Sequence, residues 1–360
     1  YARSLAGTHF KVLATPQARN STEGNGRPAC CGNASCIPVC SIGAKYDATV
    51  HVKRAVENGA ELLTQCVVRE VRCAPDGRIE QLVYDRWSRD GSRESETLAA
   101  KRFVLAAHAI ETPLLMLGSR LAARSPVGAC LMDHLQGYGL AILPQPVYPF
   151  RGPPVTSGID AFRDGPWRSE RAAFRLSIGN DGWGREEAPS ATLARLVEQG
   201  LWGRELRDAV AHRVTRMIRM SYSTEMLPRR VNRVSLAGRD AHGNSRPGID
   251  FSLPDYNVAG FEHAKRVIAQ IFARLGATET RFSFPAKNYS GAGHIMGTCR
   301  MGRSPDDSVV DSDCRVHGHP NLFIAGASLF TTSGTANPTL TAAALALRLA
   351  DMLSVRREAE

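Results

Sequence analysis

The 360-residue sequence lacks several features that would place it in a broad class at once. It has no apolar run of about 18 residues, the length that a membrane-spanning helix requires. No apolar segment typical of a signal peptide follows Tyr1. Neither a fixed-period repeat nor a low-complexity tract occurs, which argues against repeat architectures. The chain also lacks an initiator Met, so we expect it to be part of a longer protein.

The net charge of +10 and the pI of about 9.4 raise the question of an acidic partner. The basic residues are mostly Arg and are scattered along the chain, with only short runs such as "PRRVNR" at 228–233. No basic stripe interleaved with aromatic residues is present. We therefore expect a solvated, Arg-rich surface and no nucleic-acid partner.

Four of the nine cysteines lie in one short segment, "ACCGNASCIPVCSIGAK" at 29–45. They are Cys30, Cys31, Cys36 and Cys40, set among Gly, Asn and Pro residues that accept unusual backbone angles. Their spacing does not match the paired cysteine knuckles of a zinc ribbon. An iron–sulfur cluster, a disulfide-stapled loop and a zinc site remain as interpretations. The other five cysteines are isolated, and we expect them to be buried as small apolar side chains.

The order of predicted elements favours an α/β protein. Residues 47–58 read as a helix, residues 60–73 as a strand, "RIEQLVYDRW" and "LAAKRFVLAAHA" as two further strands, and 110–121 as a helix. From about 130 to 290, Pro and Gly are frequent and short strands alternate with loops, including a strand at 214–227. An amphipathic helix at 261–277 completes what reads as an antiparallel sheet with a helix on it. With 43% hydrophobic residues, the chain can build two domains.

The C-terminal part combines a buried strand, a Gly-rich bend and an apolar helix. The strand lies within 321–330, and Asn337 followed by Pro338 is typical of a helix start, with Asn at the N-cap. The helix 338–353 is almost wholly apolar, so we expect it to be buried. Its N-terminus would favour an anionic or electron-rich group.

Several motifs resemble the glucose–methanol–choline (GMC) family of flavin-dependent alcohol oxidoreductases. The resemblance is carried by His294 with "GTCRMG", "CRVHGHPNLFIAGAS", "NPTLTAAALALRLAD" and, nearer the front, "TQCVVREV" and "FVLAAHAIETPLLMLGS". It implies a Rossmann-like FAD-binding domain plus an α+β substrate domain with an antiparallel sheet. The G-x-G-x-x-G turn of that domain is missing, so we expect its N-terminal part to lie outside this chain. Residues 1–130 and 291–360 would form the FAD-binding domain, and 131–290 the substrate domain.

The resemblance also implies site residues. His294 matches the family's catalytic base, and Asn337 stands where a second His or Asn is found. An imidazole near neutral pKa can take an alcohol proton, and a carboxamide can orient the hydroxyl. Taken singly, His294 reads as a core histidine and Asn337 as a structural cap. Residues expected to contact FAD are Val68, Ala107, Gly326, Ala327, Asn337, Pro338 and Thr339. His317 and His319 could form a metal pair, but no acidic third ligand lies near them.

Within the family, the cysteine loop is similar to that of flavoprotein subunits of bacterial membrane-associated sugar and polyol dehydrogenases. This similarity implies a 3Fe-4S cluster held by Cys36, Cys40 and Cys30, with Cys31 competing for the third place. The implied activity is oxidation of a CH–OH group of a sugar, sugar acid or polyol, with electrons passed to a cytochrome c subunit. A small twin-arginine-exported subunit and a periplasmic location on the inner membrane are also implied. The alternatives are an alcohol oxidase without a cluster and a truncated, non-catalytic remnant.

Overall fold

The computed structural model describes residues 3, 5–32, 36, 39–150, 152–180, 189–283 and 290–358. Their contacts divide the chain into two compact units, between which it passes several times. Unit 1 comprises residues 1–61, 135–224 and 255–290, and unit 2 comprises residues 62–134, 225–254 and 291–360. The predicted division at 130 and 290 is a functional assignment and stays a prediction.

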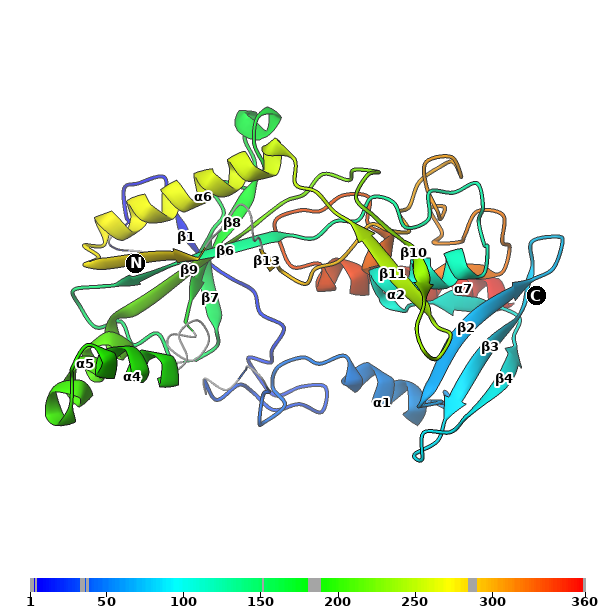
Figure 1. Ribbon diagram of the computed structural model, residues 1–360, viewed down its shortest axis with the longest axis horizontal. Helices are drawn as coiled ribbons and strands as arrows, with labels where there is room; N and C mark the ends of the chain where they lie inside the picture. Colours follow the sequence, from blue (N-terminus) through cyan, green and yellow to red (C-terminus); the bar gives the residue numbers. More distant parts are fainter. Residues whose placement is uncertain are drawn as a thin grey trace. The chain divides into compact units, whose positions relative to one another are not determined.

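Unit 1 is built on an antiparallel sheet (Figure 1). Its strands lie in the order β1 (Val12–Ala14), β7 (Val155–Ile159), β8 (Phe174–Gly179), β9 (Met217–Thr224), β6 (Leu135–Ile142) and β12 (Glu279–Ser283), and β13 (Ser290–Gly291) also pairs with β6. Side chains of β9 are buried on both faces of the sheet, the polar Arg219, Ser221 and Thr224 included. The predicted antiparallel sheet is therefore present. The predicted strand at 214–227 begins later than expected, at Met217, because α5 (Gly203–Arg216) extends up to it.

Helix α6 (Asp255–Arg274) packs on this sheet (Figure 1). Its apolar residues recur every three or four positions, and Phe261, Ala264, Ile268 and Ile271 are buried, as the periodicity predicts. The helix approaches β6 closely at Gly139, where a Cβ atom would lie 2.9 Å from side-chain carbons of α6. Unit 1 also contains α1 (Thr49–Glu57), α4 (Pro189–Glu198) and a 3₁₀ turn, η1 (Pro166–Ser169).

Unit 2 combines three small sheets with two helices. Its elements are the meander β2 (Cys66–Cys73), β3 (Ile79–Trp87) and β4 (Arg93–Ala99), the parallel pair β5 (Phe103–Leu105) and β14 (Leu322–Ile324), the hairpin β10 (Arg233–Arg239) and β11 (Ser245–Asp250), the helices α2 (His108–Gly118) and α7 (Thr339–Glu358), and the 3₁₀ turn η2 (Ala327–Leu329). The parallel pair lies inside the apolar core of the unit, together with residues of β2, β3 and α2. This mixture of parallel and antiparallel pairing confirms the predicted α/β class.

Helix α7 departs from its predicted burial. Leu349 is buried and Leu345 packs against the core, but Leu340 and Leu347 are 82% and 68% exposed. The helix is apolar on nearly all sides, yet only one face of it contacts the core of unit 2. Composition alone therefore overestimated its burial. In the described part of the chain, no helix is both long and apolar enough to cross a bilayer.

Candidate active site

The parallel strands of unit 2 bring two predicted cofactor-binding segments together. The backbone N–H of Ala325 donates to the carbonyl of Leu105 at 2.9 Å, directly after β14 and β5 end. Ala107 and Gly326 therefore follow the carboxyl ends of neighbouring parallel strands. This edge of a parallel sheet is where α/β proteins bind nucleotide cofactors.

Gly326 adopts a backbone conformation that only glycine takes readily. Its φ is 105° and its ψ is −170°, and a Cβ atom added there would have no neighbour within 4 Å. The residue thus leaves open space beside the strand ends, which suits close approach of a flat or phosphorylated group. Ala327 starts η2, and its carbonyl accepts the N–H of Gly297 at 3.2 Å. The open space beside Gly326 at this edge therefore fits the close approach of a dinucleotide.

The segment that carries His294 is paired with residues just before β6. Met132 and Met296 exchange both backbone hydrogen bonds, at 3.0 and 2.9 Å. At His134 and His294, two residues away from this bonded pair, the regular pattern of backbone hydrogen bonds stops. There the buried Asp133 carboxylate accepts the N–H of His294 at 2.8 Å and that of Gly293 at 3.2 Å. A side chain thus holds the backbone of the histidine in place.

The bend at Gly297 and Thr298, which follows His294, is also tied to α2. Gly297 has a φ of 92°, and a Cβ atom there would collide with the carbonyl of Cys130. Pro113 lies inside α2 and has no N–H for the carbonyl of Ala109. The buried Thr298 hydroxyl supplies the missing donor, at 2.7 Å from Ala109 O. The bend is therefore locked to the βα unit that carries Ala107.

His294 contacts a second histidine that the sequence analysis did not single out. His134 Nδ1 lies 2.9 Å from His294 Nδ1, and the rings meet edge to face at a centroid distance of 5.0 Å. His134 is buried, and its Nε2 lies 2.8 Å from the carbonyl oxygen of Gly334. Burial lowers the pKa of His134. Burial, together with the neighbouring His134, also lowers the pKa of His294, so both rings favour the neutral form.

The predicted second catalytic residue, Asn337, lies three residues beyond Gly334 and is exposed. The predicted N-cap at Asn337 is displaced by one residue. Helix α7 begins at Thr339, and Pro338 provides the carbonyl for its first backbone bond, from Ala342 at 3.0 Å. The hydrogen bond between His134 and Gly334 joins the loop before Asn337 to the histidine pair. Whether Asn337 acts on a substrate stays a prediction.

Val68 lies on a different sheet of unit 2. It belongs to β2, where it pairs with Tyr84 of β3, and it is 37% exposed. Strand β2 contacts α2, whereas the described hydrogen bonds do not join Val68 to the histidine pair. Its predicted contact with FAD therefore stays a prediction.

The cysteine loop belongs to unit 1. Cys36 is buried, Cys30 and Cys40 are half-buried, and Cys31 is exposed. Backbone hydrogen bonding from Lys45 lowers the pKa of Cys40, whereas burial and the neighbouring Cys40 and Cys30 raise the pKa of Cys36. Of these two thiols, Cys40 therefore more readily adopts the thiolate form, which is the form that binds metals.

The arrangement of these thiols is not that of a closed metal site. All nine cysteines are free, so the disulfide interpretation is not supported. Over the described ranges, no three His, Cys, Asp or Glu side chains are placed to hold a metal ion. Residues 33–35 and 37–38 of the loop lie outside those ranges. The donor chemistry suits a cluster, but the described positions do not enclose one.

The five isolated cysteines and the two histidines of the 317–319 loop occupy structural positions. Cys130, Cys299 and Cys314 are buried as expected, but Cys66 is half-buried and Cys73 is exposed because they lie at the two ends of β2. His317 hydrogen-bonds Ser308, and His319 bonds the carbonyl of Gly77 and the N–H of Ala122. Both histidines thus have structural partners, and the part of the chain described here shows no metal site around them.

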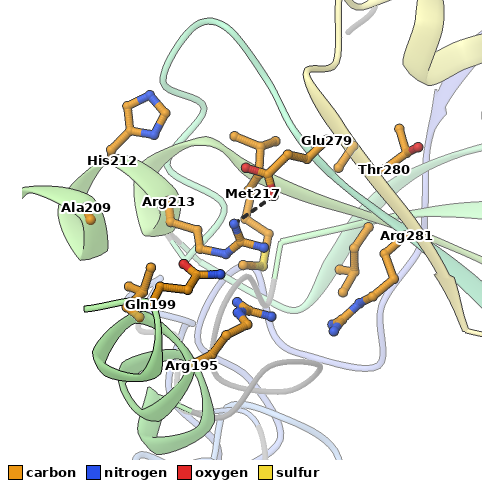
Figure 2. Close-up of a pocket in the computed structure, with 13 residues that line it drawn as sticks. Arg195, Gln199, Ala209, His212, Arg213, Met217, Glu279, Thr280 and Arg281 are labelled. Atoms are coloured by element: carbon orange, nitrogen blue, oxygen red, sulfur yellow. Dashed lines mark hydrogen bonds and ion pairs between the residues drawn. The ribbon is translucent and has the colours of Figure 1, made fainter. Parts of the chain in front are cut away.

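A cavity of about 540 Å³ lies in unit 1, between α4, α5 and strands of the sheet (Figure 2). Figure 2 shows the guanidinium groups of Arg195, Arg213 and Arg281 turned toward the same space. Arg213 pairs with Glu279 at 2.8 Å. The lining residues fall within the predicted substrate segment 131–290, and none of the predicted catalytic or cofactor residues is among them.

Comparison with known proteins identifies the family of this chain. Residues 7–136 and 228–346 match the two models that describe GMC oxidoreductases. The chain belongs to the GMC oxidoreductase family. The resemblance and the fold class predicted from the sequence are therefore confirmed.

Individual relatives include sugar and alcohol oxidoreductases. The fructose dehydrogenase large subunit of Gluconobacter japonicus is 34% identical over 96% of this chain and 63% of that protein. The paromamine 6'-oxidase of Streptomyces fradiae is 28% identical over 95% of this chain and 61% of that protein. This chain thus spans less than two thirds of the length of these relatives.

Solved structures show the same fold. The crystal structure of pyridoxine 4-oxidase from Mesorbium loti has a TM-score of 0.59 at 20% identity, covering 85% of this chain and 60% of that one. A formate oxidase structure has a TM-score of 0.58 at 14% identity, covering 81% and 60%.

Proposed function

We propose that this chain is the greater part of an FAD-dependent dehydrogenase that oxidises a CH–OH group of a sugar, sugar acid or polyol. One observation carries this proposal: His294, whose pKa is lowered by burial, lies three residues before Gly297, which hydrogen-bonds Ala327 just after the parallel strand pair. The fructose dehydrogenase large subunit among its relatives supports a sugar substrate. Bound FAD would supply the acceptor for the carbinol hydride.

The residues of the chain would divide the remaining work. His294 would take the hydroxyl proton of the substrate, because its lowered pKa leaves the ring unprotonated at neutral pH. Asn337 would orient the hydroxyl without competing for the proton. Ala107, Gly326 and Ala327 would hold the cofactor at the strand ends, with Pro338 and Thr339 at the start of α7 and Val68 on β2 as further contacts.

The base is tested by His294→Ala in the FAD-loaded enzyme. We expect turnover to fall by about 10²–10⁴-fold while FAD absorbance is retained, because a general base contributes that much. His242→Ala is the matched control, since His242 is exposed in the turn between β10 and β11. Equal turnover in the two variants would remove His294 from this role.

We further propose that Cys30, Cys36 and Cys40 hold a 3Fe-4S cluster that passes electrons to a cytochrome c subunit. The support is the concentration of thiols in one loop and the thiolate-favouring position of Cys40. The loop would have to close around the cluster. A small twin-arginine-exported subunit and a periplasmic, membrane-associated location belong to the same proposal.

Iron and acid-labile sulfide analysis tests the cluster. We expect both in the purified protein, lost in Cys40→Ser and retained in Cys73→Ser, whose thiol is exposed on β2. Absence of iron from the unsubstituted protein would favour the second candidate, an alcohol oxidase without a cluster. The lack of a closed metal site among the described residues, and the oxidase among the relatives, are the observations in its favour.

A further inference from the structure

The contact between His134 and His294 constrains where the protons of both rings lie. Their Nδ1 atoms are 2.9 Å apart, which is hydrogen-bond distance. Two neutral imidazole nitrogens at this distance share one proton, so one atom donates and the other accepts. Proton positions in such a pair follow from the remaining partners of each ring.

Gly334 decides the direction of this hydrogen bond. Its carbonyl oxygen lies 2.8 Å from His134 Nε2, and a carbonyl can only accept. His134 Nε2 must therefore carry a proton. Because burial lowers the pKa of His134, the ring is neutral at neutral pH and its Nδ1 bears a lone pair. The proton between the rings then belongs to His294 Nδ1.

We propose that His134 is a positioning residue that holds His294 in the Nδ1–H tautomer, so that His294 Nε2 is the basic atom. This inference rests on the proposed function, in which His294 is the base. Among the hydrogen bonds of the described residues, none engages His294 Nε2. In the reaction, the O–H bond of the substrate breaks, its electron pair stays on oxygen, and an Nε2–H bond forms.

The backbone explains why the two rings meet. Met132 and Met296 are bonded partners, so the short segments that carry His134 and His294 lie side by side. Asp133 holds the N–H of His294, and the carbonyl of His134 accepts the N–H of Ala292 at 2.9 Å. When His294 becomes a cation, its Nδ1–H bond to His134 becomes charge-assisted and strengthens. His134 would therefore stabilise the protonated base as well as select its tautomer.

Tautomers can be measured directly in the chain as it exists. Long-range ¹H–¹⁵N correlation spectra of ¹⁵N-histidine-labelled protein show which ring nitrogen of each of the ten histidines is protonated. We expect Nε2–H for His134 and Nδ1–H for His294. His319 is an internal reference for Nδ1–H, because its Nδ1 faces the Gly77 carbonyl and its Nε2 accepts the Ala122 N–H. A spectrum with His294 protonated at Nε2 would overturn the inference.

Two variants test the cause. His134→Phe removes the acceptor, and we expect His294 to shift to the Nε2–H form. His134→Asn keeps an oxygen acceptor near the position of Nδ1, and we expect the Nδ1–H form to be retained. An unchanged His319 signal reports an intact fold in each variant. If His134→Phe does not fold, the unsubstituted protein and His134→Asn still decide the question.

Kinetics of the FAD-loaded enzyme separate this inference from the proposed function. We expect His134→Phe to lower kcat with little change in KM. The fall in kcat should be smaller than the about 10²–10⁴-fold loss caused by removing the base itself. His134→Asn should recover most of this loss in kcat. Loss of turnover in His294→Ala together with an Nε2–H tautomer in the unsubstituted protein would reject the role of His134 alone. Normal turnover in His294→Ala would reject the proposed base, whatever its tautomer.

Discussion

The backbone N–H of His294 donates to Oδ1 of Asp133 at 2.8 Å, in place of a ladder bond to a backbone carbonyl. Asp133 is 8% exposed, so its carboxylate fixes the candidate base from inside the fold. As in the capping of a helix, a side chain here accepts hydrogen bonds from backbone N–H groups that have no backbone partner. Several consequences can be measured.

Asp133→Ala should destabilise unit 2. It removes the partly buried hydrogen bonds from the N–H groups of Gly293 and His294 to a carboxylate, and a hydrogen bond to a charged group contributes about 1.5–3 kcal/mol. Urea unfolding should show a lower midpoint than in Asp208→Ala, whose side chain is 67% exposed in unit 1. Asp133→Asn, which keeps one acceptor oxygen, should fall between them. Equal midpoints for the two alanine variants would contradict this account.

Thr298→Val should also destabilise the protein, by about 1–3 kcal/mol, because a buried carbonyl loses its donor. Pro113 cannot replace that donor, so the Ala109 carbonyl would stay unsatisfied. Thr298→Ser keeps the hydroxyl and serves as the matched control in the same unfolding experiment. A serine variant that is as unstable as the valine variant would show that packing of the methyl group is the cause.

The sequence predicts much of this site because its motifs are local. The segments around Ala107 and Gly326 each contain a strand followed by a turn, and parallel pairing of those strands places the turns together. The amphipathic period of α6 likewise fixes its buried face. These elements are determined by residues close together in the sequence, so they can be predicted from the sequence alone.

Other features depend on contacts that no local pattern encodes. His134 and His294 are 160 residues apart, and "DH" in an apolar segment does not stand out as a functional motif. The only indication in the sequence is a polar pair beside apolar residues. The exposure of Leu347 could not be predicted either, because α7 is apolar on nearly all sides and its sequence does not indicate which face contacts the core.

Gly326→Ala should be costly although nothing would clash with the added methyl group. Its φ of 105° and ψ of −170° lie in a region that other residues enter only at a cost of about 1–3 kcal/mol. Gly24→Ala is a suitable control, because Gly24 also has open space around its Cα but no positive φ. Thermal unfolding should separate the two variants. If the strand end simply relaxes, FAD affinity rather than stability would change.

The histidine pair should make the stability of the protein depend on pH. Burial lowers the pKa of both His134 and His294 below the ordinary value of about 6.5. Above that pH, the folded and unfolded chains both hold these rings neutral. Below it, the unfolded chain takes up protons that the folded chain does not yet bind, so the free energy of unfolding falls as the pH falls.

Urea unfolding followed between about pH 5 and pH 8 tests this dependence. The double variant His134→Asn/His294→Asn should lose stability less steeply toward low pH than the unsubstituted protein. Burial also lowers the pKa of His263. The variant His263→Asn therefore shows how much a single histidine in unit 1 contributes to the pH dependence of the free energy of unfolding. The pair should account for a larger part of the slope than His263 does, because His134 is almost fully buried. Parallel pH profiles for the double variant and the unsubstituted protein would show that the rings titrate normally, and that His294 is not held neutral by its surroundings.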